Sequence, residues 1–138
     1  MLGRHVVAKA VAPVTGPEDE FFWEGVREHK LLIRRCSGCK ALRHPPSPMC
    51  PHCHGRIWET QEASGRGTVY SWIVARFTRG EDPDPRLVAI VELEEGIRLV
   101  TNLQGVEVDD VRLGMPVAVS FEEVDGVLLH QFRPVGVA

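Results

Sequence analysis

The pattern of apolar and polar residues changes its period along the chain. From residue 68 onward, short stretches rich in β-branched and aromatic residues alternate at a period of two, which is typical of strands with one buried face. Polar turns separate these stretches, the clearest at residues 94–96, and residues 80–85 are predicted to form a loop. The predicted strands are residues 68–75, 86–93, 97–103, 116–122 and 127–133. Five strands with a long first member and a longer link before the fourth predict a small Greek-key barrel of the OB type.

A dense aromatic cluster marks a helix near the start of the chain. Thr15 is the predicted N-cap, Pro17 lies in the first turn and Glu18 is the capping-box partner, so a helix is predicted to run to about Lys30. Because an element of this length is not stable alone, it must pack on something. It either covers its own chain or offers its aromatic rings to another protein. The candidate partner-binding residues are Phe21, Phe22 and Trp23.

Four cysteines lie between the helix and the predicted barrel as two Cys-x-x-Cys pairs, Cys36 with Cys39 and Cys50 with Cys53. Each pair has the spacing of a tight turn that directs two sulfurs at one point, and two such turns supply the four thiolates that tetrahedral zinc prefers. The prolines between the pairs exclude a helix there. The spacing therefore predicts a rubredoxin-like zinc ribbon over residues 31–62, with the four cysteines as ligands of a structural Zn²⁺.

Other uses of these cysteines fit the sequence less well. Disulfides need an oxidising compartment, and neither Arg4 nor Lys9 flanks an apolar run that would serve as a secretory signal, so a cytoplasmic protein is expected. A redox dithiol normally uses a single pair in a βαβ context. Iron accepts the same four thiolates, so spacing alone leaves zinc and iron open. His52 or His54 could replace a cysteine, but four thiolates already close the site, and a closed site is structural.

The fold class expected from these patterns is mainly β. Of the 138 residues, 43% are hydrophobic, which leaves room for one domain or two small modules. The predicted segments are a tail at 1–14, the helix at 15–30, the zinc ribbon at 31–62 and the OB barrel at 63–138. No segment is long and apolar enough to predict a membrane span.

The charge of the chain bears on its partners. A net charge of −3 argues against a dedicated nucleic-acid-binding protein, which is usually strongly basic. Positive charge comes from thirteen arginines and only three lysines, and Arg34, Arg35 and Arg43 lie near the cysteine turns. Because the planar guanidinium suits carboxylates and phosphates, a local anion site is one interpretation. A coding bias towards arginine, with side chains that only cover the surface, is the other.

The first barrel strand carries two large rings. Strict alternation predicts Tyr70 and Trp72 on one face and Val69, Ser71 and Ile73 on the other. Filling of the barrel is the default interpretation of such rings. The alternatives are a groove for an acyl chain or for the pantetheine arm of coenzyme A, and a platform that stacks nucleic-acid bases.

The spacing of reactive residues does not suggest a catalytic set. The cysteines are assigned to the metal, there is one tyrosine, and no Ser-His-Asp or Cys-His arrangement is indicated. His29 lies at the predicted helix end, where a positive charge suits the helix dipole. His130 in the last strand is expected to be a packed or surface residue rather than a base. No catalytic residue is therefore predicted.

Several motifs together resemble the DUF35 family, which is also described as Zn-ribbon and OB-fold proteins. Residues 22–25 (Phe-Trp-Glu-Gly) look like its helix signature, and residues 31–39 are similar to its entry into the ribbon. The Pro-Pro pair of residues 44–46, followed by residues 50–53, resembles its exit, and residues 65–71 resemble the start of its barrel. Later landmarks are residues 91–93, Gly96, residues 101–103, 114–117 and 132–134. The resemblance covers about residues 18 to 135.

The resemblance implies a function that composition does not. Family members are accessory subunits of acyl-CoA enzymes, notably of thiolase-superfamily proteins. The preferred branch is bacterial steroid side-chain degradation, in which a thiolase-like lipid-transfer protein performs a retro-aldol cleavage of a steroid acyl-CoA. This chain would then be a non-catalytic subunit of a hetero-oligomeric aldolase, helping to form or close its acyl-CoA site. The alternatives are an acyl-CoA hand-off scaffold between two enzymes and a single-stranded nucleic-acid-binding module. The unpatterned opening of the chain would suit a linker to a hydratase domain.

Overall fold

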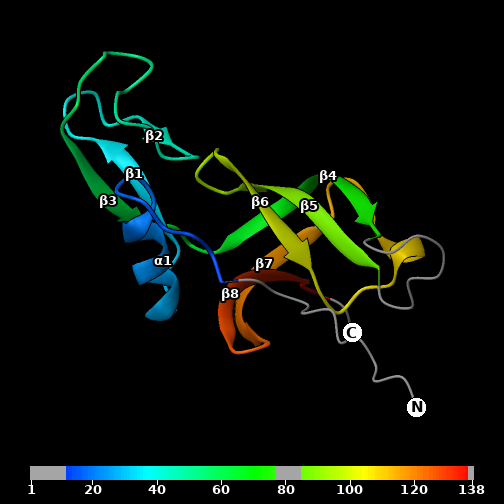
Figure 1. Cartoon of the computed structure of the whole chain (residues 1–138). Coiled ribbons are helices and arrows are strands. Elements are labelled where there is room, and N and C mark those ends of the chain that lie inside the picture. Colours follow the sequence, from blue (N-terminus) through cyan, green and yellow to red (C-terminus); the bar gives the residue numbers. More distant parts are fainter. Residues whose placement is uncertain (1–11, 77–84, 137–138) are drawn as a thin grey trace.

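The described part of the chain folds into an α-helix, a three-stranded antiparallel sheet and a closed barrel, in that order (Figure 1). The computed structural model describes residues 12–76 and 85–136. The helix is α1 (Glu20–Arg27), and the sheet has the strand order β2-β1-β3, with β1 (Leu32–Cys36), β2 (Leu42–Arg43) and β3 (Trp58–Glu62). The barrel has the order β4-β5-β6-β8-β7, with β4 (Arg66–Ala75), β5 (Arg86–Leu93), β6 (Arg98–Leu103), β7 (Pro116–Val124) and β8 (Val127–Pro134). A short 3-10 helix (Val108–Asp110) lies in the link between β6 and β7. The predicted mainly β architecture is confirmed.

Antiparallel pairs join most neighbouring strands of the barrel, and a short parallel pairing of β6 with β8 closes it. Burial alternates along the whole of β5, because successive side chains of a strand point to opposite faces. The hairpin predicted at residues 94–96 joins β5 to β6, and Gly96 takes a φ of 88° there, which favours glycine. The described strands begin and end within two residues of the predicted ones. Most of the loop predicted at residues 80–85 lies outside the described residues.

The predicted alternation in the first barrel strand was wrong. A β-bulge interrupts the pairing of β4 with β5, because the register passes from Val69 opposite Val91 directly to Ser71 opposite Ile90. Tyr70 is the extra residue and is exposed, whereas Trp72 packs against the core. An inserted residue reverses the facing of everything after it, so the two rings lie on different sides of the strand.

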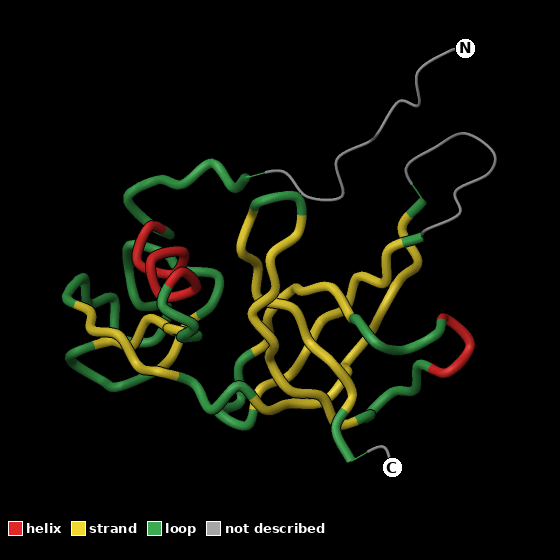
Figure 2. The backbone as a smooth tube through the Cα atoms, turned by 90° about the horizontal axis from the view of Figure 1, so that it is seen from below, coloured by secondary structure: helices red, strands yellow, loops and turns green. Residues whose placement is uncertain are grey.

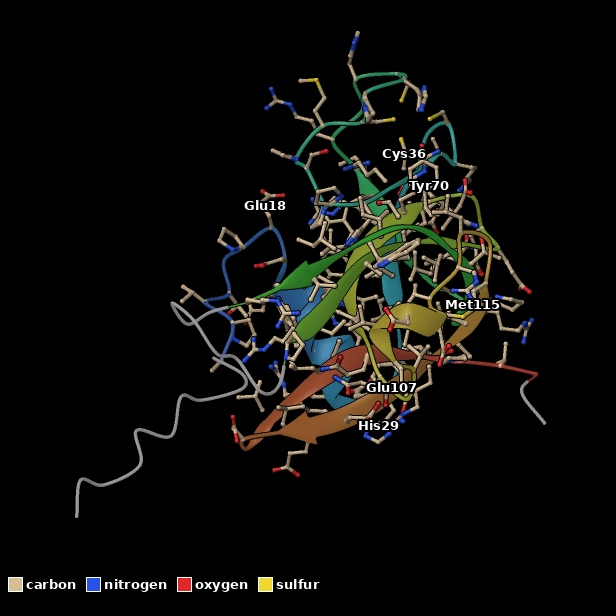
Figure 3. All side chains as sticks on the ribbon, turned by 90° about the vertical axis from the view of Figure 1, so that its right-hand side faces the viewer. Glu18, His29, Cys36, Tyr70, Glu107 and Met115 are labelled. Atoms are coloured by element: carbon tan, nitrogen blue, oxygen red, sulfur yellow. The ribbon has the colours of Figure 1, made fainter. Side chains whose placement is uncertain are left out.

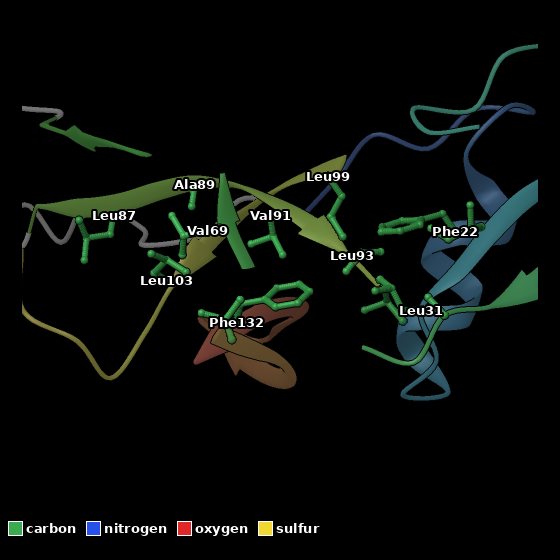
Figure 4. Packing of buried hydrophobic residues seen from close by; sticks show 14 of the residues in the cluster. Phe22, Leu31, Val69, Leu87, Ala89, Val91, Leu93, Leu99, Leu103 and Phe132 are labelled. Carbon is green, nitrogen blue, oxygen red and sulfur yellow. The ribbon is translucent and has the colours of Figure 1, made fainter. Parts of the chain in front are cut away.

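The apolar core of the barrel continues into the contact with the helix (Figure 4). Inside the barrel, Val91 and Phe132 are fully buried. In Figure 4, Leu99 lies between these residues and Phe22 of α1. Phe22 and Leu31 belong to the same cluster, so α1 and the start of the ribbon share the core of the barrel. Because burial of each large apolar side chain contributes about 1.5–3 kcal/mol, this shared cluster holds the three parts of the chain together.

The helix begins later than predicted. Residues 17–19 form a turn, and α1 starts at Glu20. Glu18 does not act as a capping-box partner, because its carboxylate receives a hydrogen bond from Arg34 at 2.7 Å. Asp19 instead closes the turn, since its side chain accepts a hydrogen bond from the backbone amide of Gly16 at 2.8 Å. Thr15 is therefore not the N-cap. The ion pair of Glu18 with Arg34 of the ribbon forms in place of the predicted capping box.

The helix also ends earlier than Lys30, for a local reason. His29 takes a φ of 60°, and its amide donates to the carbonyl of Val26 at 2.9 Å. The Lys30 amide donates to the carbonyl of Gly25 at 2.8 Å. These two bonds form a Schellman motif, which ends a helix with one left-handed residue. The ring of His29 then stacks on Phe121 of β7, with centroids 5.3 Å apart.

The helix and the ribbon strands lie together on one side of the barrel (Figure 2). The chain crosses from β3 to β4 over residues 63–65, where Gly65 packs against Val119 of β7. The division of the chain at residues 30 and 62 stays a prediction, although these positions lie at or near element ends. Within the described ranges, no helix has the length and apolar character needed to cross a membrane.

Candidate metal centre and adjoining hollows

Two turns of the same geometry carry the four cysteines. In each turn the backbone amide four residues after the first cysteine donates to that cysteine's carbonyl, from Lys40 to Cys36 and from His54 to Cys50, both at 2.9 Å. Lys40 and His54 take φ values of 66° and 64°, the left-handed conformation that closes the turn. Cys36 is the last residue of β1, so the pairing of that strand positions the first turn. Because neither left-handed residue is a glycine, nothing but the Cys-x-x-Cys spacing signalled these turns.

The four sulfur atoms gather at the end of the ribbon that carries Cys36 (Figure 3). All four lie within 4.8 Å of one another, with Cys36 and Cys53 3.5 Å apart and Cys39 and Cys50 3.6 Å apart. Tetrahedral zinc with Zn–S bonds of about 2.3 Å needs sulfurs about 3.8 Å apart. A side chain at Gly55 would come within 3.3 Å of the Cys53 sulfur, so the glycine leaves the cluster free of crowding. The arrangement fits a four-thiolate zinc site.

The thiols of this cluster compete for protons. The amide of Cys39 donates to the Cys36 sulfur and lowers the pKa of Cys36 to about 6. The amide of Cys53 lowers the pKa of Cys50 in the same way. The hydrogen bond from the Ala41 amide lowers the pKa of Cys39. The hydrogen bond with the Cys50 sulfur and burial both raise it, and their combined effect is larger, so the pKa of Cys39 is raised to about 11. Four thiolates this close repel one another unless a cation lies between them, and Zn²⁺ meets that condition.

Neither nearby histidine belongs to the cluster. Among residues 12–76 and 85–136, the group that could hold a metal ion consists of the four cysteines and contains neither His52 nor His54. His54 instead provides the left-handed residue of the second turn. Four sulfurs around one zinc ion leave no open position for water or substrate. A zinc ion held here would stabilise structure.

Arg34 links the ribbon to the turn before α1. Its side chain is only 1% exposed, and Nη1 donates to Glu18 Oε2 at 2.7 Å and to the Ser47 carbonyl at 2.8 Å. Nη2 donates to the Glu18 carbonyl at 3.0 Å, and the guanidinium carbon lies 3.9 Å from the centroid of the Trp58 ring. Pairing and hydrogen bonding of this kind are what allow a charge to be buried. The sequence did not signal this role, because the partners are far away along the chain.

The aromatic residues of α1 pack within their own chain. Phe22 is buried and makes an edge-to-face contact with His130 of β8, with centroids 5.0 Å apart. Phe21 lies 5.0 Å from the ring of Trp58. Phe21 and Trp23 are half-buried against the core and keep part of their surface exposed. The role of these three residues in binding another protein stays a prediction.

An apolar hollow of about 510 Å³ opens where α1, the barrel and the loop after β2 meet. Its walls include Phe22, Trp23, Tyr70, Ile90, Leu99 and Val100. His44 from the loop and His130 from β8 also line it. Burial, assisted by the nearby His130, lowers the pKa of His44 to about 4. Burial also lowers the pKa of His130, so both rings are neutral at pH 7.

A second hollow, of about 460 Å³, lies between the same loop and the β5–β6 hairpin, and we call it the cationic hollow. It shares His44, Pro45 and Arg98 with the apolar hollow. Arg43 also lines it, is only 6% exposed, and donates from Nε to the Ser47 carbonyl at 2.9 Å. The two terminal nitrogens of Arg43 are buried without a hydrogen-bond partner among the described residues.

The middle of the outer surface of β4, β5 and β6 is apolar, and the paired residues Glu92 and Arg98 lie at one end of it. Ile73 and Val100 are 63% and 61% exposed, and Tyr70 is also exposed. The register sets Ile73 beside Val88 and Val100 beside Ile90, so these five side chains form one area that we call the outer patch. Contiguous exposed apolar residues of this kind mark contact surfaces for proteins or apolar ligands. A single-stranded nucleic acid would instead require a positively charged groove along the stacking rings.

Two family models match adjacent parts of the chain. Residues 23–59 match the ChsH2 rubredoxin-like zinc ribbon domain. Residues 60–122 match the C-terminal OB-fold domain of ChsH2. The two matches follow the order of the ribbon and the barrel in the structure.

The curated relatives are of two kinds. A probable enoyl-CoA hydratase alpha subunit of Thermomonospora curvata is 47% identical over 124 residues. The 3-oxo-4,17-pregnadiene-20-carboxyl-CoA hydratase alpha subunit of Mycobacterium tuberculosis is 33% identical over 130 residues. Each match covers 88% of this chain and 39% of the relative, so the chain spans well under half the length of these subunits. A DUF35 domain-containing scaffold protein of Methanocaldococcus jannaschii is 32% identical over 124 residues, which is 82% of this chain and 88% of that protein.

A solved structure is similar over nearly the whole of its own chain. It is a chain of the Ltp2-ChsH2(DUF35) aldolase, with a TM-score of 0.82 and 46% sequence identity. The match covers 88% of this chain and 98% of that chain. At this identity the likeness concerns the sequence as well as the fold.

Proposed function

Because this chain belongs to the DUF35 family of zinc-ribbon and OB-fold proteins, we propose that it is a zinc-stabilised accessory subunit of a thiolase-superfamily acyl-CoA enzyme. The observation that carries the proposal is the likeness to the DUF35 chain of the Ltp2-ChsH2(DUF35) aldolase. The reaction proposed for the assembly is a retro-aldol cleavage in steroid side-chain degradation. The likeness to the pregnadiene-carboxyl-CoA hydratase subunit supports the steroid branch.

The proposed role of the metal is structural. Cys36, Cys39, Cys50 and Cys53 would hold one Zn²⁺, and the ion would fix the two turns against each other. When bound, the ion would neutralise the negative charge of the four thiolates, and with four sulfur ligands it would have no open coordination position. Catalysis is accordingly assigned to the thiolase-like partner, in which the base and the enolate stabiliser would reside.

The partner is proposed to cover the outer patch of the barrel. The patch exposes three large side chains, Tyr70, Ile73 and Val100, beside the apolar hollow lined by Trp23. A protein that covered both would bury an apolar area and would close one wall of the hollow, which supports a role in forming or closing an acyl-CoA site. Phe22 and Trp23 line this hollow, whereas Phe21 packs against Trp58 of β3. The part of all three residues in partner binding is proposed, and the exposed portion of Trp23 adjoins the same surface.

Co-expression with a thiolase-like lipid-transfer protein tests the proposal. The two proteins are expected to elute together in gel filtration and to cleave a steroid acyl-CoA only in combination. Ile73→Glu and Val100→Glu place charges in the outer patch and should reduce co-elution at least tenfold, because an unpaired charge is costly in an apolar interface. Leu113→Glu is the matched control, since Leu113 is equally exposed but lies outside the patch. Separate elution of the wild-type chains, or full cleavage by this chain alone, would refute the assignment.

A hand-off scaffold between two acyl-CoA enzymes is the second candidate function. The description of the archaeal relative as a scaffold protein favours it. A scaffold needs two partners bound at once, whereas the first proposal needs one. Light scattering of the purified assembly distinguishes the two by its composition, because only the scaffold gives a complex that contains three different chains.

A further inference from the structure

Two of the four cysteines in the metal cluster are open to solvent. Cys39 and Cys53 are exposed, whereas Cys36 and Cys50 are buried. The turns that carry them lie at the end of the ribbon that points away from the barrel (Figure 1). A cysteine that ligates a metal is held as a thiolate, and the thiolate is the form that reacts with oxidants. In the zinc-loaded protein, Cys39 and Cys53 would therefore be exposed nucleophiles.

Glycines flank the sulfur of Cys53 and the sulfur beside it. A β-carbon at Gly55 would lie 3.3 Å from the Cys53 sulfur and 3.5 Å from the Cys36 sulfur. A β-carbon at Gly38 would lie 3.9 Å and 3.8 Å from the same two sulfurs. Neither glycine has a positive φ, so the backbone conformation does not require glycine at these positions. The two glycines instead leave this side of the cluster open to a small reagent.

The Cys36 sulfur is placed to complete an oxidation that begins at Cys53, because the two sulfurs lie 3.5 Å apart. An oxidised thiolate becomes a sulfenic acid, which condenses with a neighbouring thiolate to a disulfide. On the other side of the cluster, the sulfurs of Cys39 and Cys50 are 3.6 Å apart. The Cys39 sulfur, however, accepts a hydrogen bond from the Ala41 amide, which draws on the negative charge of the thiolate. The exposed sulfur with the more open approach is therefore that of Cys53.

We propose that Cys53 is a site of oxidative modification by peroxides, and that Cys36 converts the product to a disulfide. The Cys53 thiolate attacks one oxygen of hydrogen peroxide, the O–O bond breaks, and the other oxygen leaves as hydroxide, which solvent protonates to water. The Cys36 thiolate then attacks the sulfur of the Cys53 sulfenic acid, the S–S bond forms, and a second hydroxide leaves and is protonated. The two sulfurs lose two electrons, which the peroxide gains. A disulfide no longer supplies two thiolate ligands, so the ribbon loses its metal. This chemistry goes beyond the proposed function and does not need the partner.

The modification would reach the rest of the chain through the ribbon. β1 ends at Cys36 and carries Arg34, which pairs with Glu18 in the turn before α1. The loop after β2 supplies His44 to the wall of the apolar hollow. Because so small a ribbon depends on its metal, both contacts are expected to loosen when the disulfide forms. Oxidation at Cys53 would therefore open one wall of the apolar hollow.

Titration of the zinc-loaded chain with hydrogen peroxide, in the presence of a chromogenic zinc chelator, tests the site. One zinc ion is expected to be released per chain. Alkylation followed by tandem mass spectrometry should identify the first disulfide as Cys36–Cys53. Hydrogen exchange should then speed up in β1 and α1 but not in the barrel strands. A first disulfide between Cys39 and Cys50 or within one turn, or retention of zinc and of all four thiols in excess peroxide, would overturn the proposal.

Two glycine variants and one control test the open approach. Gly38→Ala adds a methyl group at ordinary contact distance from both sulfurs, so it should keep its zinc affinity in chelator competition and slow the peroxide-driven release at least about threefold. Gly55→Ala brings its methyl group closer and should slow the release further, and Gly38→Ala keeps the test decisive if Gly55→Ala binds zinc less tightly. Gly16→Ala meets no heavy atom within 4 Å and should leave the rate unchanged. Wild-type release rates in zinc-loaded Gly38→Ala and Gly55→Ala would refute the proposal, whereas failure of partner co-elution alone would leave it standing.

Discussion

The zinc ribbon and the barrel are stabilised by different interactions. The barrel interior is filled by apolar side chains from its strands, such as Val91 and Phe132. The most deeply buried side chains of the ribbon include a guanidinium and two sulfurs, from Arg34, Cys36 and Cys50. Burial of apolar surface is an intrinsic property of the chain, whereas clustered thiolates need a cation before they attract one another. The two adjacent regions are therefore expected to depend on different conditions.

Loss of the metal should produce the largest difference in stability between the ribbon and the barrel. Cys39→Ser or Cys53→Ser is expected to unfold the ribbon at residues 31–62, because zinc binding contributes on the order of 10 kcal/mol to so small a module. The barrel strands should keep their amide protection in hydrogen exchange. Ser37→Ala, in the first cysteine turn, is the matched control and should keep stoichiometric zinc. Full protection of β1 and β3 in metal-free protein would show that the ribbon does not need the ion.

A cavity in the barrel should produce the converse result. Phe132→Ala is expected to lower the free energy of unfolding by about 3–5 kcal/mol, because it leaves a void at a fully buried position. Zinc content should stay at one ion per chain in the folded fraction. Denaturant unfolding followed by metal analysis measures both quantities, and Ile73→Ala on the exposed face should cost less than about 0.5 kcal/mol. Release of zinc at the same denaturant concentration as barrel unfolding would show that the regions are coupled.

Acid should weaken the junction between the two regions before it unfolds the barrel core. The pKa of His44 is lowered from 6.5 to about 4 by burial, so the unfolded state binds more protons than the folded state between these values. Stability is therefore complete above about pH 6.5 and falls by up to about 3 kcal/mol as the pH approaches 4. His44→Gln cannot titrate and should show a shallower slope than the wild type in this window. Parallel unfolding curves of the two proteins between pH 7 and pH 4 would contradict the explanation.

The contact between the ribbon and α1 should give the smallest change. Glu18→Gln removes the charge that pairs with buried Arg34 and is expected to cost about 1–2 kcal/mol, less than a fully buried pair because Glu18 is about half exposed. Hydrogen exchange should speed up in α1 while the barrel strands are unaffected. Glu20→Gln, on the exposed side of the first turn, is the control. If both variants speed exchange equally, the helix does not depend on Arg34.

The parts of the structure that could be predicted from the sequence have local causes. The Cys-x-x-Cys pairs indicated the four-sulfur cluster because each turn forms within five residues. The hairpin at Gly96 and the strands of the barrel followed from alternation and turn chemistry, which act between near neighbours. The family landmarks led to the same order of helix, ribbon and barrel.

The errors arose where a distant residue competed with a local preference. Glu18 was expected to cap the helix but pairs with Arg34, sixteen residues away, and so the helix begins later. The bulge at Tyr70 reversed the facing of β4, and no turn residue announces it. The sequence made Arg43 a candidate for an anion site, but it left open the alternative that a coding bias towards arginine explains its presence. The structure adds that the two terminal nitrogens of Arg43 are buried and have no hydrogen-bond partner among the described residues.

The sequence by itself determined the architecture and the four-cysteine cluster, because periodicity and cysteine spacing are properties of short segments. Only the tertiary structure decided which charges are buried, which histidines become neutral and which side chains line a shared hollow. These properties depend on desolvation by residues from α1, the ribbon loop and the barrel at once, and no window along the chain contains all three.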